Sequence, residues 1–471
     1  MEAARVARLG LAGLAIALVA YLALDPAARP SGFLRDFNAF YCAGAALDRN
    51  ADPYRAEPLG TCEREVRPAP FAFGRANLSV PAPLPPYALA PFAVLARLPY
   101  PVAAALWILA LAAAFVVTTL ALRRATGLPL PGIVAALALG DGYASLCIGQ
   151  IAPLAVAAVA LAALFAEQGR VAAAGWAAAA AMLEPHVGLP ACVGLFVWRA
   201  GARIPLLASA AVALALSLWL AGPAVSLEYV QSVIPAHALS EIANEKQLSL
   251  SYFLHRLGLD ETLALRAGSL SYLVMLALGV GLSPPLAQRL RSPGLLAALP
   301  PALALLGGPF GHIAQVPAAL PATLLLLARA PQARRVLSAV TVMLAIPWVQ
   351  FTTLGTLFGV LAALATGIIA RTLGGARAMA AAALGFGALL FVGLLLALVL
   401  TQPPDPTALL AAHYDPRALA ESSWGLYVTT VAGSNLAAYD LARVPTLAGL
   451  LVLALWSLRN GSSAAARIPP Q

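Results

Sequence analysis

Long apolar runs separated by short polar or basic segments extend along almost the whole chain. A segment inside a bilayer must satisfy its own backbone hydrogen bonds, so runs of about 17–25 apolar residues predict membrane-spanning helices. We expect spans at 9–24, 91–122, 130–148, 151–166, 171–184, 186–198, 204–222, 263–282, 294–309, 313–328, 336–352, 354–370, 378–400 and 444–458. The short pair flanking Glu184-Pro185 is a candidate for broken or re-entrant helices. The pattern predicts an all-α polytopic transmembrane helical bundle of about 12–14 passes, with residues 1–471 as a single domain.

Composition and charge agree with a membrane protein. Hydrophobic residues make up 61% of the chain, charged residues 10%, and the mean hydropathy is +0.85, which excludes an ordinary soluble domain. Arginines cluster between apolar runs, with an even number of expected spans between clusters: Arg5, Arg8, Arg123, Arg124, Arg170, Arg199, Arg203, Arg289, Arg291, Arg329, Arg334, Arg335, Arg371, Arg377, Arg459 and Arg467. The positive-inside rule then places these clusters and both termini in the cytoplasm. The net charge of +9 reflects topology, so we expect no nucleic-acid partner.

The first apolar run, preceded by Arg5 and Arg8, also resembles a secretory signal peptide. No small-residue cleavage site follows it, since Leu24-Asp25-Pro26 leads into a charged and aromatic segment. We therefore expect a retained first helix. Abundant alanine and a single lysine against many arginines indicate a GC-rich bacterial genome, and hence the bacterial plasma (inner) membrane.

Three long loops fall on the outer, periplasmic face in this topology, at 25–90, 223–262 and 401–443. They hold most of the polar residues that are not arginines, which favours an activity on that face. Cys42 and Cys62 both lie in the first loop, where the oxidising environment permits a disulfide. Two free thiols remain the alternative.

Asp36 lies a few residues beyond the first expected span, within the segment 35–41. A carboxylate at a membrane face is placed to act on a lipid-borne substrate, but Asp36 is also a suitable N-cap for a helix over 36–47. Glu184 and His186 have two interpretations as well. They form part of a buried site with Asp141 or Gln150 as partners, or they are solvated at a turn marked by Pro185.

Several short motifs occur in a characteristic order. They are Asp36-Phe37-Asn38-Ala39-Phe40-Tyr41-Cys42-Ala43-Gly44, Asp52-Pro53-Tyr54, Pro85-Pro86-Tyr87 with Pro91, Leu98-Pro99, Trp107, Gly149-Gln150 and Pro185. Together they resemble glycosyltransferase family 87, the polyprenyl-phosphate-mannose-dependent mannosyltransferase-like proteins of the GT-C superfamily. The resemblance covers roughly residues 30–200.

The resemblance implies a helical membrane enzyme that uses a polyprenyl-phosphate sugar, mannose-like, and a lipid or glycan acceptor at the outer face. Asp36 corresponds to the family's catalytic base, and the lipid-linked donor is a substrate, so no cofactor is implied. One position departs from the family, because many members carry Lys-Pro where this chain has Glu184-Pro185. A glutamate cannot neutralise a donor phosphate as a lysine can.

The same chemistry makes separate demands on the residues. A carboxylate that removes the acceptor's hydroxyl proton typically contributes about 10²–10⁴-fold in rate, and one carboxylate suffices for a single inverting displacement. The leaving phosphate needs cations or hydrogen-bond donors, for which the candidates are Arg35, Arg55, Lys246, His255, Arg256 and His312. Substrate-binding candidates beyond these cations are Tyr41, Tyr54, Gln150, Glu184 and His186. No metal ligands are assigned, because no CxxC, HExxH or compact carboxylate cluster is present, although loops could assemble one.

Two other functions fit the same topology. A transporter or flippase of lipid-linked sugars would depend on mid-membrane charges, here Asp141, Glu184 and His186. A lipid-linked polymerase or ligase would share the outer-face geometry but act on a pyrophosphate-linked oligosaccharide. The enzyme hypothesis requires the first outer loop and Asp36, whereas a transporter would leave the outer loops dispensable.

Overall fold

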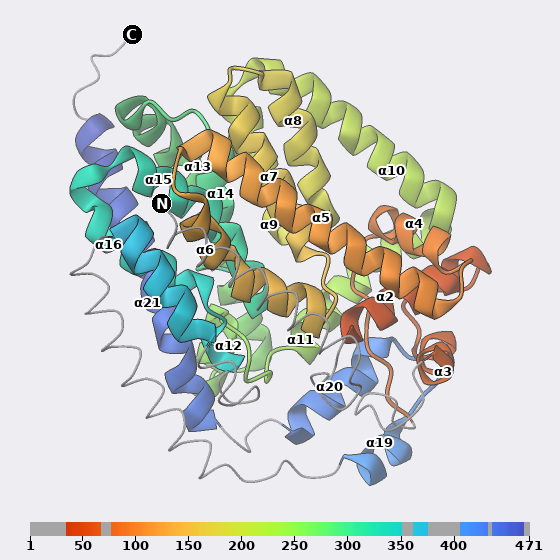
Figure 1. Cartoon of the computed structure of the whole chain (residues 1–471). Coiled ribbons are helices and arrows are strands. Elements are labelled where there is room, and N and C mark those ends of the chain that lie inside the picture. The colour runs from red at the N-terminus through yellow and green to blue at the C-terminus, as the bar shows by residue number, and fades with distance from the viewer. Residues whose placement is uncertain (1–33, 67–76, 351–360, 375–405, 432–435, 466–471) are drawn as a thin grey trace, which may run out of the picture.

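The computed structural model describes residues 34–66, 77–350, 361–374, 406–431 and 436–465. In these ranges the chain is helical, with two isolated β-bridges and no strand (Figure 1). The expected all-α class is therefore confirmed. The expected spans 9–24 and 378–400, and with them the signal-peptide alternative, lie outside the described residues.

Four described helical segments have the length and composition to cross a membrane. They are α5 (Tyr100–Thr126), the stretch Ala200–Ser240, which is kinked at Gly222, α13 (Glu261–Leu290) and Tyr439–Ser462 within α21 (Leu436–Ala465). The stretch Ala200–Ser240 comprises α10 (Ala200–Glu228), η4 (Tyr229–Val233) and α11 (Ile234–Ser240). A pair of helices, Ile313–Arg329 and Pro331–Ala345, bends by 112° and gives up to one more span.

Other expected spans correspond to shorter apolar helices. These include α7 (Ala152–Glu167), α8 (Val171–Ala180) with η3 (Ala181–Leu183), α9 (Pro185–Trp198) and α14 (Leu295–Ala304). Proline explains one difference in boundaries: the run expected at 91–122 is divided into α4 (Pro86–Leu95) and α5, and Pro99 is the N-cap of α5. The expected 130–148 span is α6 (Leu130–Gly142) followed by the π-helical η2 (Tyr143–Cys147).

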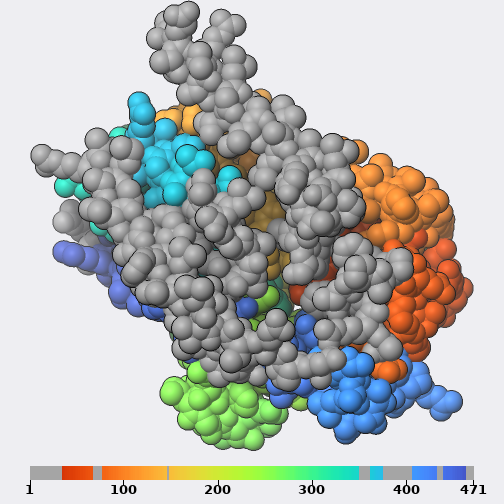
Figure 2. Space-filling view, turned by 60° about the horizontal axis from the view of Figure 1, so that its bottom comes forward, coloured from red at the N-terminus to blue at the C-terminus, as the bar shows by residue number. Residues whose placement is uncertain are grey.

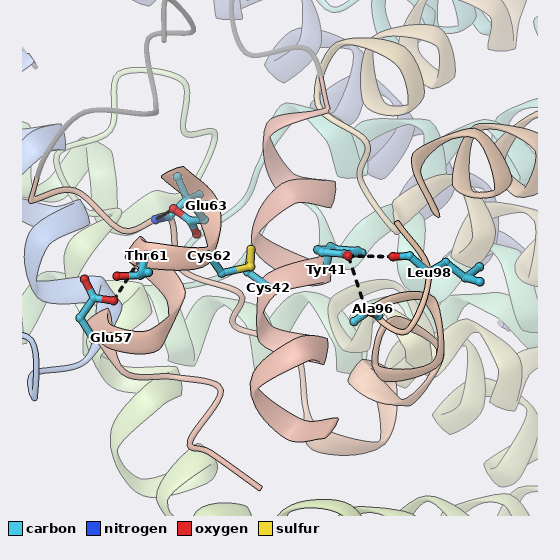
Figure 3. Close-up of a disulfide and its surroundings, with 9 residues drawn as sticks. Tyr41, Cys42, Glu57, Thr61, Cys62, Glu63, Ala96 and Leu98 are labelled. Atoms are coloured by element: carbon cyan, nitrogen blue, oxygen red, sulfur yellow. Dashed lines mark hydrogen bonds between the residues drawn. A yellow bond between two sulfur atoms is a disulfide. The ribbon is translucent and has the colours of Figure 1, made fainter. Parts of the chain in front are cut away.

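The first outer loop folds against the bundle as two helices, α2 (Arg35–Asp48) and α3 (Ala56–Val66). A disulfide between Cys42 and Cys62 joins them (Figure 3), so the bridge left open by the sequence is present. On the opposite side of α2, Tyr41 donates from its hydroxyl to the Leu98 carbonyl at 2.8 Å (Figure 3). A side chain at Gly44 would collide with the Phe92 backbone, so α2 and α4 lie in direct contact.

The third outer loop packs onto the first. Its described helices are α19 (Thr407–His413) and α20 (Ala420–Val431), and the Ala420 N–H donates to the Tyr54 carbonyl at 2.9 Å. Together with α11 and α12 (Leu250–Arg256) of the second loop, these helices gather at one end of the bundle (Figure 1). Red, green and blue segments from the three loops accordingly border the same face in Figure 2. Segments far apart in sequence therefore meet where the candidate site lies.

Candidate functional site

Asp36 lies in the first turn of α2, and its carboxylate is held by two donors. Arg35 Nε donates to Asp36 Oδ1 at 2.6 Å, and Gln150 Nε2 donates to Asp36 Oδ2 at 2.6 Å. The residue is only 8% exposed. The N-cap alternative is wrong, since the N-cap is Leu34, with φ 54°, and no side chain caps α2. The Asp36 N–H instead donates to the Ile148 carbonyl at 2.8 Å.

Gln150 reaches Asp36 because the turn after η2 docks on the start of α2. Gly149 has φ +68°, and a side chain there would press on Phe37 and Leu34. The Gly149 carbonyl also accepts from Trp107 Nε1 at 2.9 Å. Through these contacts the Gly149-Gln150 motif packs directly against the motif around Asp36.

A second carboxylate, Glu241, lies beside this pair at the end of α11. Trp424 Nε1 donates to its Oε1 at 2.5 Å, while Asn244 Nδ2 (2.6 Å) and Gln247 Nε2 (3.1 Å) donate to its Oε2. The Arg35 guanidinium lies 5.4 Å from the centre of the Trp424 ring. Burial would raise the pKa of Glu241, but the electrostatic interactions with His312 and His237 and the hydrogen bonds from Trp424 and Asn244 outweigh it, so the pKa is lowered. Glu241 is therefore a fixed anion that interacts with Arg35, the residue that holds Asp36.

Asp36 and Glu241 belong to a cluster of buried polar side chains. Glu184, His186 and His312 form the other end of this cluster. Glu184 is 7% exposed, which excludes the solvated turn for this side chain. Its Oε1 accepts from Gln315 Nε2 at 3.0 Å and lies 3.1 Å from His186 Nδ1. Gln315, in η5 (Ile313–Ala319), in turn accepts from the His312 N–H through Oε1 at 3.1 Å.

Phe310 and the second loop connect this end to Glu241. The Phe310 ring packs edge-on against His186, with centroids 4.3 Å apart, and against His237, at 5.1 Å. Gln247 pairs with His312 in an isolated β-bridge. Neither expected partner bonds to Glu184: Gln150 holds Asp36, and both Asp141 carboxylate oxygens lack hydrogen-bond partners within the described ranges.

The remaining predicted substrate-binding residues have contacts elsewhere. Tyr41 anchors the loop before α5, and the Tyr54 hydroxyl donates to the Leu84 carbonyl at 2.8 Å. Arg256 pairs with Asp440 at 3.2 Å, and His255 precedes it on α12. These contacts hold the outer-face segments together, and a role for these residues in substrate binding stays a prediction.

Sequence reasoning missed several residues of the cluster: His237, Glu241, Gln247, Phe310, Gln315 and Trp424. The sequence pointed to only some of these residues. His237, Glu241 and Trp424 stood out as polar or aromatic residues of the second and third outer loops. Nothing in the sequence indicated that the two loops meet at Asp36.

Three side chains of the cluster have the chemistry of metal ligands. His237, Glu241 and His312 offer ligand atoms within 4.8 Å of one another, and His237 Nδ1 has no hydrogen-bond partner among the residues described. The His312 ring, however, accepts the Gln315 N–H as a cap of η5, and Gln247 Nε2 lies 3.5 Å from its Nδ1. A neutral imidazole that accepts at one nitrogen keeps its proton on the other, whereas a metal-bound histidine usually donates from its second nitrogen. The contacts of His312 thus favour a hydrogen-bond network over metal coordination.

Comparison with known proteins gives one match. The model of glycosyltransferase family 87 matches residues 84–307. This range includes Gln150, Glu184, His186 and Glu241, but it begins after Asp36 and ends before His312. No curated protein and no solved structure matches the chain.

Proposed function

Because the chain belongs to glycosyltransferase family 87 and is a membrane glycosyltransferase, we propose that it transfers a sugar from a polyprenyl-phosphate donor to a lipid or glycan acceptor. In this proposal Asp36 is the general base. The observation that carries the proposal is the fixed carboxylate of Asp36, with Arg35 on one oxygen and Gln150 on the other. A base must be held in one orientation to take a proton from a bound hydroxyl.

The step is a single displacement. The acceptor oxygen attacks the anomeric carbon, its proton passes to Asp36, and the bond from the sugar to the phosphate oxygen breaks with its electron pair leaving on the phosphate. Asp36 has further capacity to accept a proton, because each carboxylate oxygen offers two lone-pair positions and, within the described residues, one donor contacts each. Inversion at the anomeric carbon follows from one displacement.

The position of the cluster supports an outer-face reaction. Its residues come from the segments expected at the periplasmic surface of a bacterial plasma membrane, and the arginine clusters expected in the cytoplasm lie at the opposite ends of those spans. Mannose is the sugar that the family resemblance suggests. Glu184 takes part through Gln315 and the His312 backbone, so its role is to order the site and not to neutralise phosphate.

Sugar transfer by membranes containing the protein and labelled polyprenyl-phosphate mannose tests the proposal. Asp36→Asn keeps the shape of the side chain but removes its basicity, and should lower the rate about 10²–10⁴-fold. Unchanged transfer by this variant at normal expression would refute the assignment of the base.

Asp141→Asn is the matched control. Asp141 is equally buried and acidic, but its carboxylate has no hydrogen-bond partner in the described structure. A transporter of lipid-linked sugars would depend on this mid-membrane charge, whereas the enzyme should keep its transfer activity. Loss of function in Asp141→Asn with full activity in Asp36→Asn would therefore favour transport.

A further inference from the structure

Lys246 is the single lysine of a chain that has 29 lysine and arginine residues in total. It lies in the turn between α11 and α12, between Glu241 and Gln247, both of which belong to the site. In a chain whose other cationic residues of this kind are all arginines, the one lysine therefore lies next to the candidate site.

The backbone around Lys246 is held on both sides. The Lys246 N–H donates to Asn244 Oδ1 at 3.0 Å, and the Gln247 side chain accepts from the Gly311 N–H at 2.6 Å. The preceding carbonyl, of Glu245, accepts from the guanidinium of Arg443, which is buried against the Tyr252 ring. The second loop, α21 and the segment before η5 together fix where the lysine emerges.

The charged groups that interact electrostatically with the Lys246 ammonium include Arg35 and Asp36 from α2, and Glu241 and Glu245 from its own turn. The ion pairs found among the described residues near the site, such as Arg35 with Asp36 and Arg443 with Asp440, do not include Lys246. Burial lowers the pKa of Lys246 to about 8, with a contribution from Arg35, and the three carboxylates offset this only in part. An anionic ligand beside Lys246 would therefore stabilise the charged form of its ammonium group.

We propose that Lys246, together with Arg35, binds the phosphate of the lipid-linked donor. The inference rests on the proposed function and identifies the cation that its leaving group requires. The donor phosphodiester carries one negative charge, and breaking its bond to the sugar leaves a monoester that gains a second. Lys246 and Arg35 balance that charge while the acceptor proton moves to Asp36 beside them.

Three candidate arginines on the outer face pair with carboxylates, Arg35 with Asp36 among them. Arg55 pairs with both Asp52 and Glu228, and Arg256 pairs with Asp440.

The single lysine permits a direct test on the unmodified protein. The purified full chain is treated at pH 8 with an amine-acylating reagent, and acylation is measured by mass spectrometry on the peptide that contains Lys246. An anion that raises the lysine pKa by one unit or more should lower the reactive neutral fraction about 5-fold or more. Polyprenyl phosphate should give this protection, whereas polyprenol of the same length should not. Inorganic phosphate tests whether the headgroup suffices, since protection by phosphate alone would identify a free-phosphate site and overturn the lipid assignment.

Binding of polyprenyl phosphate to variants distinguishes the possible failures. Lys246→Gln should weaken binding about 10-fold or more, the effect of losing one charge-assisted hydrogen bond, and Lys246→Arg should recover most of it. Arg97→Gln is the control, because Arg97 pairs with Asp48 at an exposed position away from the cluster. If the wild type binds and Lys246 is neither protected nor required, the phosphate assignment fails while the glycosyltransferase proposal stands. If the wild type does not bind polyprenyl phosphate at all, the donor class fails as well.

Discussion

Gln150 and Asp36 lie 114 positions apart in the sequence, and the Gln150 amide donates to the Asp36 carboxylate at 2.6 Å. Arg35 holds the other carboxylate oxygen. The pair fixes the plane of the carboxylate, so the remaining lone pairs of Asp36 point in defined directions. Two motifs that are each weak alone thus combine into one structural unit.

Gln150→Leu should lower the rate of sugar transfer about 10-fold or more, because a hydrogen bond to a charged group contributes about 1.5–3 kcal/mol. The acceptor affinity should change less than the maximal rate, since the substitution disorients the base without removing it. Steady-state kinetics with labelled donor measure both quantities. Gln168→Leu is the control, at an exposed position after α7, and equal losses in the two variants would argue against a role for Gln150.

Trp424→Phe should reduce activity and lower stability by about 1–3 kcal/mol, because it leaves the buried Glu241 Oε1 without its donor while keeping an aromatic ring beneath Arg35. Thermal unfolding and transfer assays measure the two effects. Trp219→Phe should change neither, since Trp219 is 79% exposed on an expected lipid-facing helix. A Trp424→Phe variant with wild-type stability would show that the bond to Glu241 has little effect on the fold.

The helical class could be predicted from the sequence because a bilayer permits few alternatives to helices for long apolar runs. The helix near Asp36 was also predicted closely, at 36–47 against the observed Arg35–Asp48. Division of long runs was harder to predict. Pro99 separates α4 from α5 and α10 is kinked at Gly222 just before Pro223, whereas Pro205 lies near the start of α10 without interrupting it.

The site was predictable only in part, and the reason is its assembly from distant segments. Asp36, Gln150, Glu184 and His312 were identified individually from motifs or from polar residues next to apolar runs. The contact between Trp424 and Glu241, 183 positions apart, depends on how the outer loops fold together. Hydropathy carries no information about such contacts.

Removing the disulfide should destabilise the first outer loop. Cys42 and Cys62 are separated by 20 positions, and closing a loop of this size contributes about 3 kcal/mol in the chain-entropy model. Cys42→Ala combined with Cys62→Ala should therefore lower the unfolding temperature, and a reductant should shift the wild type to the same value. Cys192→Ala supplies the control, as Cys192 is unbridged, and insensitivity of the wild type to reductant would contradict the prediction.

Chelation should leave sugar transfer unchanged if His312 acts through hydrogen bonds. Its ring accepts the Gln315 N–H, an arrangement that competes with metal binding. Activity is measured after EDTA treatment and dialysis, alongside the metal content of the purified protein. Loss of activity that Zn²⁺ or Mn²⁺ restores, and that Glu241→Gln makes irreversible, would instead identify His237, Glu241 and His312 as metal ligands.

Glu421 should make stability depend on pH in the opposite sense to an ordinary surface carboxylate. Burial raises its pKa from 4.5 to about 8, with a smaller contribution from Asp52, and neither carboxylate oxygen has a hydrogen-bond partner among the described residues. A raised folded-state pKa gives stability that is complete below about pH 4.5 and is lost as the pH rises through 8. Glu421→Gln mimics the protonated form, so its unfolding temperature should exceed that of the wild type at pH 9, by about 2–4 °C for each kcal/mol gained. The difference should shrink at pH 5, and Glu65→Gln, at an exposed position of α3, should show no such trend. A constant difference across this range would mean that Glu421 does not titrate there.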